Sequence, residues 1–529
     1  MEDTCIYEVN GDKNGLRIVD GYDKVEQGYT DYLRDESNVY GSGVKRIYFP
    51  TSISNLVYAV REALDNGESL TISGGRTGIC AGAVPYGGYI ISLEKMKRVL
   101  KIWKDGNGNY LLKAQSGIRL NEISNILRNR IFSGIEVDEK FLEEKKRYFY
   151  PPDPTETSAT LGGTVATNAS GARTLYYGPT RNWVEELTVV LADGRVLKIK
   201  RGDIKGEDGV FRIPVANGGY FQVPVPRYNI PKVKHSAGYY SRKRMDLIDL
   251  FIGSEGTLGV IAEVTVRLVK EPDYLYGGVL FFDNEVDCID FVENTRREFS
   301  PLALEYFDAS SLNLLLAVKR DQGPTSEIPD YSENRYAVYL ELFKNHYEDF
   351  IKLLDRFEKY LFKYGIRSDE VISALNKRDH GRLKKFRHQV PEKINSIIAE
   401  RKKSIPSLHK VGTDFSVPNG KLREMMSFYR ETLNQSGIEY YIFGHIGNNH
   451  VHVNMVPHSE DELQRAKILY RRFCEMAVKL GGSVSAEHGI GKLKKEYLRI
   501  LFDDSTISQM KKIKMTLDPE GMLNPGNLF

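Results

Sequence analysis

The sequence has little of what would place it in several protein classes. Its four cysteines are scattered without paired spacing, which favours a reduced, cytoplasmic chain over a disulfide framework and leaves no place for a cysteine-ligated iron–sulfur cluster. Lys and Arg exceed Asp and Glu by only 74 − 71 = 3, so nothing supports a nucleic-acid-binding protein. No run of about 18 uncharged apolar residues occurs, so we expect no membrane-spanning helix. Residues 1–10 lack the basic start and apolar run of a signal peptide. Attachment at a membrane periphery stays open.

The length and the order of the patterns predict several domains. A chain of 529 residues is expected to form about two to four domains. Residues 1–43 show little periodicity and are interpreted as an N-terminal lead-in. Residues 44–270 alternate helical and strand-like patterns. Residues 271–480 predict a second, α+β domain with an antiparallel sheet and helices on one side. Residues 481–529 are interpreted as a C-terminal segment.

Local patterns are clearest at two places in the first domain. Residues 53–64 keep their apolar side chains on one helical face, and Gly67 ends the helix. Residues 187–191 and 195–199 predict a hairpin across Ala192-Asp193-Gly194.

Three glycine-rich stretches also lie in this domain: Ser73–Gly82, Pro151–Gly178 and Gly253–Ile261. Glycine lets the backbone approach a ligand closely, and consecutive backbone N–H groups form an anion-binding nest, which suits a pyrophosphate or a flat ligand. The spacing is not that of the Rossmann or Walker loops. Taken singly, an ordinary glycine turn, a tightly packed turn region and a β-bulge also explain them.

The C-terminal part predicts a strand, a helix and a return segment. Residues 451–455 alternate like a strand, and residues 460–480 keep one apolar helical face. A capping box of Ser459 and Glu462 begins the helix, and Gly481-Gly482 ends it. These elements can bring together two turns that hold His445, His450, His452, Glu487 and His488. Two His and one Glu with an open position is the composition of a catalytic zinc-type site.

The three glycine stretches, in this order, resemble the motifs of the FAD-linked oxidases of the vanillyl-alcohol-oxidase type. The closer resemblance is to the branch of D-lactate dehydrogenases, glycolate oxidase flavin subunits and D-2-hydroxyglutarate dehydrogenases. It covers most of the chain and includes the closing Asn524-Pro525-Gly526. It implies an α+β protein: a two-subdomain FAD-binding domain of the p-cresol-methylhydroxylase type in residues 44–270, and an α+β substrate (cap) domain with an antiparallel sheet and the metal-site histidines in residues 271–480. Residues 481–529 would return to the flavin site.

The resemblance also implies which residues bind FAD. They are Gly74, Gly75, Arg76, Thr77, Gly78, Gly82, Pro152, Asp153, Thr160, Gly162, Gly163, Asn168, Gly171, Gly178, Glu255, Gly256, Gly259, Ile261 and Asn524. Some members of the wider family hold FAD covalently through a histidine in the first loop. This chain has no histidine there, so we expect non-covalent FAD.

By the same resemblance, His445, His452 and Glu487 are ligands of a divalent metal, zinc or manganese, and His488 is the catalytic base. The family pattern Gly-His-x-Gly-Asp-Gly-Asn-x-His has Asp, Gly and Asn where this chain has Asn448, Asn449 and His450. On a regular strand His450 faces the same side as His452. It is interpreted as an extra ligand, an outer partner of the ligands, or a surface residue.

Four residues are candidates for binding the substrate. Arg387 falls where relatives carry an arginine for the substrate carboxylate, and a guanidinium fork suits that group. A solvated charge is the competing interpretation, because the segment is rich in basic residues. Lys410 is a weaker candidate for the same role. His450 and Asn454 complete the predicted set.

The predicted activity is the FAD-dependent oxidation of a small 2-hydroxy acid to the 2-oxo acid, of the D-lactate, glycolate or D-2-hydroxyglutarate type. The electron acceptor is left open among oxygen, a quinone, a cytochrome, an electron-transfer flavoprotein and an iron–sulfur subunit. The expected location is cytoplasmic or membrane-peripheral. Two alternatives are a transferase like alkyl-dihydroxyacetonephosphate synthase and a flavoprotein electron-transfer subunit of a larger complex.

Overall fold

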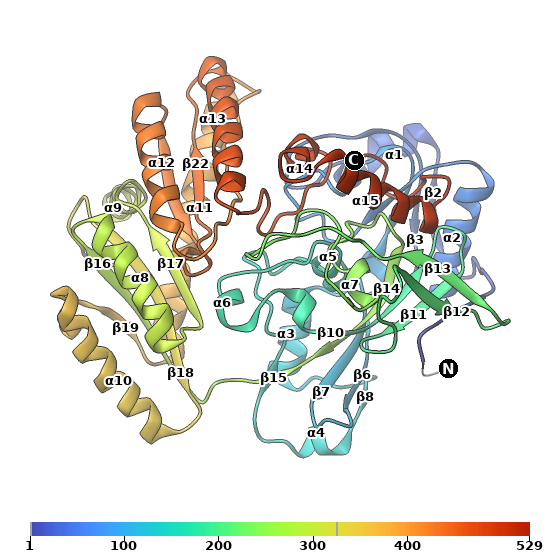
Figure 1. The fold of residues 1–529 in the computed structure, drawn as a ribbon, viewed down its shortest axis with the longest axis horizontal. Coiled ribbons are helices and arrows are strands. Elements are labelled where there is room, and N and C mark those ends of the chain that lie inside the picture. The colour runs from blue at the N-terminus through green and yellow to red at the C-terminus, as the bar shows by residue number, and fades with distance from the viewer. Residues whose placement is uncertain (1–2, 324–325) are drawn as a thin grey trace.

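The computed structural model describes residues 3–323 and 326–529. Figure 1 shows two lobes. The first combines the N-terminal half of the chain with the C-terminal helices α14 (Lys495–Leu501) and α15 (Asp504–Leu517), and the second holds most of the elements in between. In the described part of the chain, no helix combines the length and the apolar character needed to cross a membrane.

The first lobe contains two main β-sheets. The smaller has the order β2-β3-β5-β4, and β5 pairs in parallel with both β3 and β4. Its strands are β2 (Arg17–Asp20), β3 (Ser42–Phe49), β4 (Leu70–Ser73) and β5 (Tyr86–Ser92). The larger has the order β1-β11-β10-β14-β7-β6-β8, in which only β6 and β8 pair in parallel. Its strands are β1 (Cys5–Tyr7), β6 (Val99–Lys104), β7 (Tyr110–Gln115), β8 (Glu136–Val137), β10 (Val184–Val190), β11 (Val196–Lys200) and β14 (Val260–Arg267).

Helix α2 (Ile53–Asp65) joins these two sheets. Ser52 caps it by accepting a hydrogen bond from the backbone N–H of Asn55, which satisfies one of the free N–H groups of the first turn. Its buried face, with Leu56 and Val60, shares one core with side chains of β4, β5, β10, β11 and β14. The helix and the β10–β11 hairpin occupy the residues that the sequence predicts.

The remaining elements of the first lobe are short: α1 (Tyr22–Gly28), α3 (Leu120–Asn129), α4 (Glu139–Glu143), β9 (Tyr148–Phe149), α5 (Leu161–Ala166), α6 (Thr174–Tyr177), β12 (Val210–Pro214), β13 (Tyr220–Pro224), α7 (Ile248–Phe251) and β15 (Val269–Lys270). The described part of the lead-in, residues 3–43, is more ordered than its sequence indicates. It supplies β1, which pairs with β11, and β2, which pairs with β3. Strands of three or four residues are too short to show a period.

The second lobe is built on a seven-stranded sheet of order β19-β16-β18-β17-β21-β22-β20, and every pair in it is antiparallel. Its strands are β16 (Tyr274–Phe282), β17 (Ala303–Phe307), β18 (Tyr336–Lys344), β19 (Ile372–Ala374), β20 (Val411–Gly412), β21 (Tyr440–Gly444) and β22 (His452–Met455). The last helix of the lobe, α13 (Glu460–Lys479), is capped by Ser459 as predicted.

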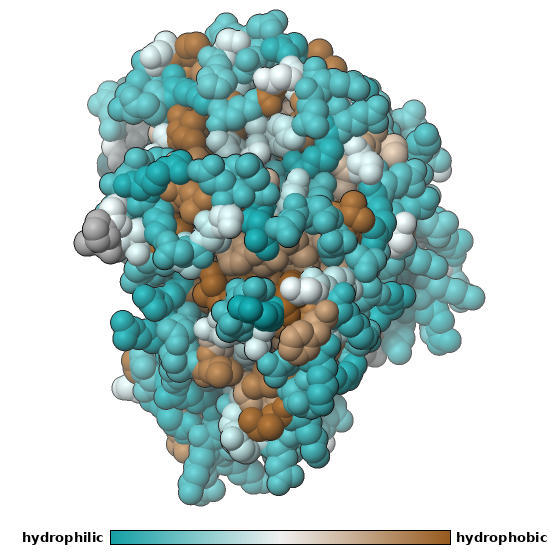
Figure 2. All heavy atoms as spheres, turned by 90° about the vertical axis from the view of Figure 1, so that its left-hand side faces the viewer, coloured by the Kyte–Doolittle hydropathy of each residue, from teal (hydrophilic) through white to brown (hydrophobic). Residues whose placement is uncertain are grey.

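Helices cover both faces of this sheet, so the prediction of helices on one side is wrong. The lobe holds α8 (Glu285–Phe299), α9 (Ala309–Gln322), α10 (Tyr347–Leu361), α11 (Lys377–Ser404), α12 (Leu422–Ser436) and α13. Leu280 and Phe282 of β16 share a core with α8 and α10, while Val279 and Phe281 share another with α9 and α11. Since both faces of the strands are apolar, both need cover. The outer face of the lobe is mostly hydrophilic, with hydrophobic residues in scattered groups (Figure 2).

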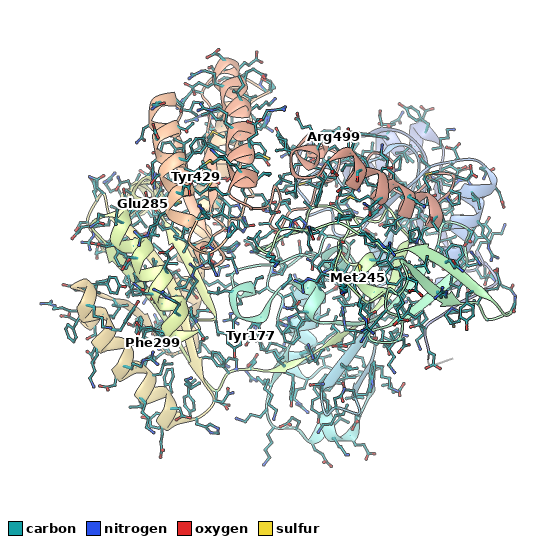
Figure 3. The ribbon with its side chains drawn as sticks, in the orientation of Figure 1. Tyr177, Met245, Glu285, Phe299, Tyr429 and Arg499 are labelled. Carbon is teal, nitrogen blue, oxygen red and sulfur yellow. The ribbon has the colours of Figure 1, made fainter. Side chains whose placement is uncertain are left out.

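The two lobes meet beside α6. Tyr177, at the end of that helix, lies at the boundary in Figure 3. Its neighbour Tyr176 packs edge-on against Phe343 of β18, with ring centroids 5.1 Å apart. Nε of Arg173 lies 2.7 Å from a carboxylate oxygen of Glu341 in a largely buried ion pair. These contacts fix the second lobe over the second glycine stretch.

Candidate active site

A cavity of about 360 Å³ lies in the first lobe, within the ~300–1,000 Å³ range of ligand pockets. All three glycine stretches line it, together with Glu487 and His488 from the C-terminal turn. The predicted FAD residues in its lining are Gly74, Gly75, Arg76, Thr77, Gly78, Gly82, Thr160, Gly162, Gly163, Glu255, Gly256, Gly259, Ile261 and Asn524. Segments far apart in the sequence therefore converge on one space.

Five predicted FAD residues do not line this cavity: Pro152, Asp153, Asn168, Gly171 and Gly178. They shape the turns around it. A Cβ on Gly171 would lie 2.0 Å from the carbonyl oxygen of Asp153, and the side chain of Asn168 accepts a hydrogen bond from the backbone N–H of Arg181. Gly178 ends α6 at φ +76°, where glycine avoids the strain of a side chain. Close packing within the protein explains these positions.

At other glycines, packing within the protein does not explain why a side chain is absent. A Cβ on Gly78 would meet no atom closer than 4.0 Å, and one on Gly82 none closer than 3.7 Å. Neither residue has a positive φ. A ligand lying against the backbone accounts for glycine at both places. Asp35, which the sequence analysis missed, also lines the cavity, and its buried Oδ2 has no hydrogen-bond partner in the described part of the chain. The cavity therefore fits a cofactor such as FAD.

Glu255 connects the third glycine stretch to the C-terminal turn. Its buried carboxylate accepts hydrogen bonds from the backbone N–H groups of Ile490, at 2.7 Å, and Gly491, at 2.6 Å. Burial raises the pKa of Glu255 to about 7, although these two N–H groups act in the opposite direction. The contacts hold the turn that carries Glu487 and His488 against the cavity.

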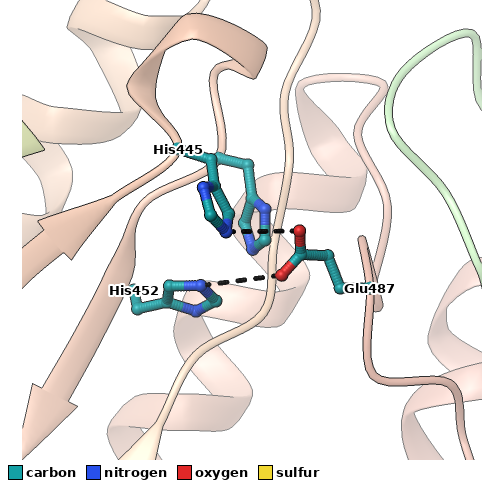
Figure 4. Close-up of side chains that lie close together, drawn as sticks. His445, His452 and Glu487 are labelled. Carbon is teal, nitrogen blue, oxygen red and sulfur yellow. Dashed lines mark ion pairs between the residues drawn. The ribbon is translucent and has the colours of Figure 1, made fainter. Parts of the chain in front are cut away.

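The histidines lie at the end of the second lobe's sheet. His445 directly follows β21, and His452 begins β22 opposite Phe443 of β21. One ring nitrogen each from His445, His450 and His452 and one carboxylate oxygen of Glu487 all lie within 4.8 Å of one another. Nε2 of His445 is 3.2 Å from Glu487 Oε1, and Nε2 of His452 is 4.0 Å from Oε2 (Figure 4). Imidazole and carboxylate donors in this number fit zinc or manganese.

Outer partners orient two of these rings. Nδ1 of His445 lies 2.7 Å from Oε1 of the buried Glu305, and Nδ1 of His452 lies 2.9 Å from the carbonyl oxygen of Thr413. In both rings Nε2 is left to face Glu487, as in metal sites whose histidines are held by a second hydrogen bond. Burial alone would lower the pKa of His445, but Glu305 and Glu487 raise it to about 9. Burial and the neighbouring His450 hold the pKa of His452 well below its usual range.

Lys234 is a member of the cluster that the sequence analysis missed. Its ammonium group pairs with Glu487 Oε1, and only 3% of its side chain is exposed. Ser170 Oγ donates to the same oxygen at 3.1 Å. Burial alone would raise the pKa of Glu487, but His445 and Lys234 hold it well below its usual range. Oε1 therefore lies beside His445, Lys234 and Ser170, while Oε2 faces His452.

Asp414 is another residue that the sequence analysis missed. Its fully buried carboxylate accepts hydrogen bonds from the backbone N–H groups of Glu487 and His488, at 3.1 and 3.0 Å. Nδ1 of His488 lies 3.3 Å from Oδ2, and Lys494 Nζ lies 3.2 Å from the same oxygen. The ring of His488 stacks on that of His452 at 5.5 Å. Burial alone would raise the pKa of Asp414, but His488 and Lys494 hold it well below its usual range.

The predicted substrate residues differ in their surroundings. Arg387 on α11 is largely buried, and its Nε is 3.9 Å from Oε2 of Glu305, so it is not a solvated charge. Lys410 precedes β20 and is partly buried, which lowers the pKa of its ammonium group. Asn454 is buried on β22, opposite Gly412 of β20.

One departure from the family pattern has a local explanation. Asn449 stands where the family has glycine, and its φ is +51°. Asparagine adopts this left-handed conformation more readily than most residues. Its side-chain oxygen accepts a hydrogen bond from Arg296 at 2.7 Å. Asparagine can therefore occupy this left-handed position in the turn between β21 and β22.

A glycine-lined cavity that ends at a histidine and glutamate cluster is suited to a flavin-dependent oxidoreductase. Comparison with known proteins agrees. The family described as FAD binding domain matches residues 44–200, and the family described as FAD linked oxidases, C-terminal domain, matches residues 275–528. The chain belongs to the FAD-linked oxidases and is an FAD-dependent enzyme, which confirms the resemblance seen in the sequence.

Three curated relatives extend over nearly the whole chain. A D-lactate dehydrogenase of Anaerostipes hadrus is 27% identical over 94% of this chain and 92% of its own. The glycolate oxidase subunit GlcD of Bacillus subtilis is 24% identical over 99% and 96%. A D-2-hydroxyglutarate dehydrogenase of Stutzerimonas stutzeri is 27% identical over 94% of each chain. A solved structure of alkyldihydroxyacetonephosphate synthase superposes with a TM-score of 0.59 at 17% identity, over 91% of this chain and 77% of that one. This likeness confirms the predicted fold.

Proposed function

We propose that this enzyme oxidises a small 2-hydroxy acid to the 2-oxo acid. The observation that carries the proposal is the position of His488. It lines the flavin-sized cavity, rests on the carboxylate of Asp414, and stacks on His452 of the metal-type cluster. The names of the three relatives, which concern D-lactate, glycolate and D-2-hydroxyglutarate, support the substrate class.

Different residues of the chain would take the hydroxyl proton and hold the substrate. With Nδ1 turned to Asp414, His488 presents Nε2 to take the hydroxyl proton, and the carboxylate of Asp414 stabilises the imidazolium that forms. Arg387 binds the substrate carboxylate through its planar fork. FAD held in the glycine-lined cavity would supply the acceptor for the hydride from C2, and a divalent ion held by His445, His452 and Glu487 would supply Lewis-acid polarisation of the hydroxyl. The reaction balances, because the acid loses one hydride to FAD and one proton to His488.

Each turnover would also need an external acceptor for the two electrons taken from the acid. The described residues contain four free cysteines, which lie far apart in sequence, so the chain offers no cysteine-ligated cluster to pass electrons on. GlcD is named as a subunit, which supports a protein partner. We propose an iron–sulfur subunit, a quinone or an electron-transfer flavoprotein as the acceptor, and a cytoplasmic location. The transferase alternative has only the shared fold in its favour.

The test is anaerobic visible spectroscopy of the FAD-loaded protein, with D-lactate, glycolate, D-2-hydroxyglutarate and the L-forms added singly. We expect one acid to bleach the flavin band and a chelator to prevent the bleaching. His488→Asn should retain FAD and lose the bleaching. His458→Asn is the matched control, because that side chain is 58% exposed and pairs with Glu439 away from the cluster. If no acid bleaches the wild type, the proposed activity is wrong.

A further inference from the structure

His450 stands where the family pattern has asparagine, and it is fully buried. It lies in the turn that leads into β22, where its backbone N–H donates to the carbonyl oxygen of His445 at 3.2 Å. Its ring centroid is 4.5 Å from that of His452 and 5.4 Å from that of His445. This position excludes the interpretation of His450 as a surface residue.

Nδ1 of His450 lacks a hydrogen-bond partner within the described ranges. Nε2 is 3.3 Å from Oδ1 of Asp414, so Asp414 engages only one of the two ring nitrogens. Leaving a buried polar group unpaired costs about 1–3 kcal/mol, so a partner for this ring is expected. One of its nitrogens lies within 4.8 Å of the donor atoms of His445, His452 and Glu487.

The other interpretation makes His450 only an outer partner, held by Asp414 and facing away from a metal. The neighbouring rings provide the comparison. His445 and His452 each give Nδ1 to an acceptor outside the cluster and turn Nε2 inward. His450 uses its nitrogens the other way round, because Nε2 approaches Asp414 and Nδ1 is left free. An imidazole can satisfy both an outer carboxylate and a metal in this way.

We propose that His450 is a third histidine ligand, so that this chain holds its divalent ion with three His and one Glu. The inference rests on the metal site of the proposed function and adds a ligand that the family pattern lacks. Four protein ligands fill a tetrahedral shell, which is the arrangement of structural zinc. An ion that also receives the hydroxy acid must therefore accept five or six ligands, and manganese does so more readily than zinc.

The test measures the metal itself in the FAD-loaded protein. Wild type, His450→Asn and the surface control His458→Asn are stripped of metal and titrated with Mn²⁺. Pulsed electron paramagnetic resonance then counts the imidazole nitrogens bound to the ion. We expect three imidazoles in the wild type and the control, and two in His450→Asn. Loss of an outer partner costs about 10–100-fold in metal affinity, so loss of a ligand should weaken binding by about 100-fold or more. FAD content and circular dichroism report whether the variant folds.

The outcomes separate this inference from the proposed function. Two imidazoles in the wild type, unchanged affinity in His450→Asn, or no Mn²⁺ binding by the wild type would each overturn it. Three imidazoles in a wild type whose flavin no hydroxy acid reduces would uphold the ligand set and refute the substrate class. A wild type whose flavin is reduced by a hydroxy acid, but which coordinates Mn²⁺ through two imidazoles, would uphold the substrate class and refute the ligand set.

Discussion

Asp414 is the residue whose replacement tests the proposed mechanism most directly. It holds His488 through the backbone N–H at 3.0 Å and through Nδ1 at 3.3 Å. Asp414→Asn keeps the size of the side chain and removes its charge. The imidazolium that forms when His488 takes a proton then loses its neighbouring carboxylate. A hydrogen bond to a charged group is worth about 1.5–3 kcal/mol, so we expect flavin reduction to slow by about 10–150-fold at unchanged FAD content.

The same substitution also has a cost in stability, which must be separated from the cost in rate. Lys494 is only 12% exposed and would lose its charged partner. Leaving a buried charge unpaired typically costs about 3–5 kcal/mol. Asp308→Asn is a matched control, because Asp308 is equally buried, pairs with Arg430 at 3.0 Å and caps α9 through the N–H of Ser311. Both variants should lose stability, but only Asp414→Asn should lose rate.

Stopped-flow reduction of the flavin across a range of pH is the deciding assay. If Asp414 stabilises the imidazolium, flavin reduction should slow in Asp414→Asn and keep the wild-type rate in Asp308→Asn. A purely structural role would slow both variants alike. A wild-type rate in Asp414→Asn, or an equal loss of rate in Asp308→Asn, would refute the reasoning.

Three further predictions concern the substrate-binding arginine, Glu255 and two glycines. Arg387→Lys keeps the charge but loses the planar fork, so we expect KM to rise about tenfold or more with a smaller change in kcat, measured by steady-state kinetics. The pKa of Glu255 is about 7 in the folded chain against an ordinary 4.5. Its favourable contribution to the free energy of unfolding is therefore complete below about pH 4.5 and is lost as pH rises to about 7, a loss of up to about 3 kcal/mol. Urea unfolding of the apoprotein should show this decline in stability with pH, and Glu255→Gln should flatten it. Gly82→Ala should weaken FAD binding without changing apoprotein stability, whereas Gly171→Ala should destabilise the apoprotein, as thermal unfolding and FAD titration will show.

Elements with strong local signals could be predicted from the sequence. Helix α13 begins at the Ser459 cap and ends before Gly481, because both signals act within one helical turn. The β10–β11 hairpin forms across Asp193-Gly194, where a turn sequence separates two apolar runs. In each case the residues that decide the structure are neighbours along the chain.

The missed site residues are those whose role depends on distant parts of the chain. Lys234 reaches Glu487 across 253 positions, and Glu305 reaches His445 across 140. Neither lies in a recognisable motif, and a buried charge is ordinary until its partner is known. Asp414 follows Lys410 by four residues and carries no signal of its own, since a single Asp after a short strand is usually a turn residue. Only the fold brings these groups together.

The glycine motifs show that a correct motif still mixes two physical roles. Gly171 is explained by the Asp153 backbone, which a Cβ would meet at 2.0 Å, whereas Gly82 has open space on the cavity side. Both belong to stretches that the sequence assigns to FAD. A motif identifies the region of the chain that surrounds the ligand. The structure then separates the residues that face the ligand cavity from those that pack against the protein itself.

The charges around the cluster suggest why an ion and a hydroxy acid belong together there. Three buried carboxylates each have a cationic neighbour, in the pairs Glu305–Arg387, Glu487–Lys234 and Asp414–Lys494. These pairs balance, and His445, whose pKa is about 9, adds one positive charge at neutral pH. A divalent ion that displaces this proton raises the excess to two. The carboxylate of a 2-hydroxy acid supplies one negative charge and would bring the excess back to one. The proton that His488 takes from the hydroxyl stays within the site, so this positive charge would remain beside the alkoxide while it forms, which favours oxidation at C2.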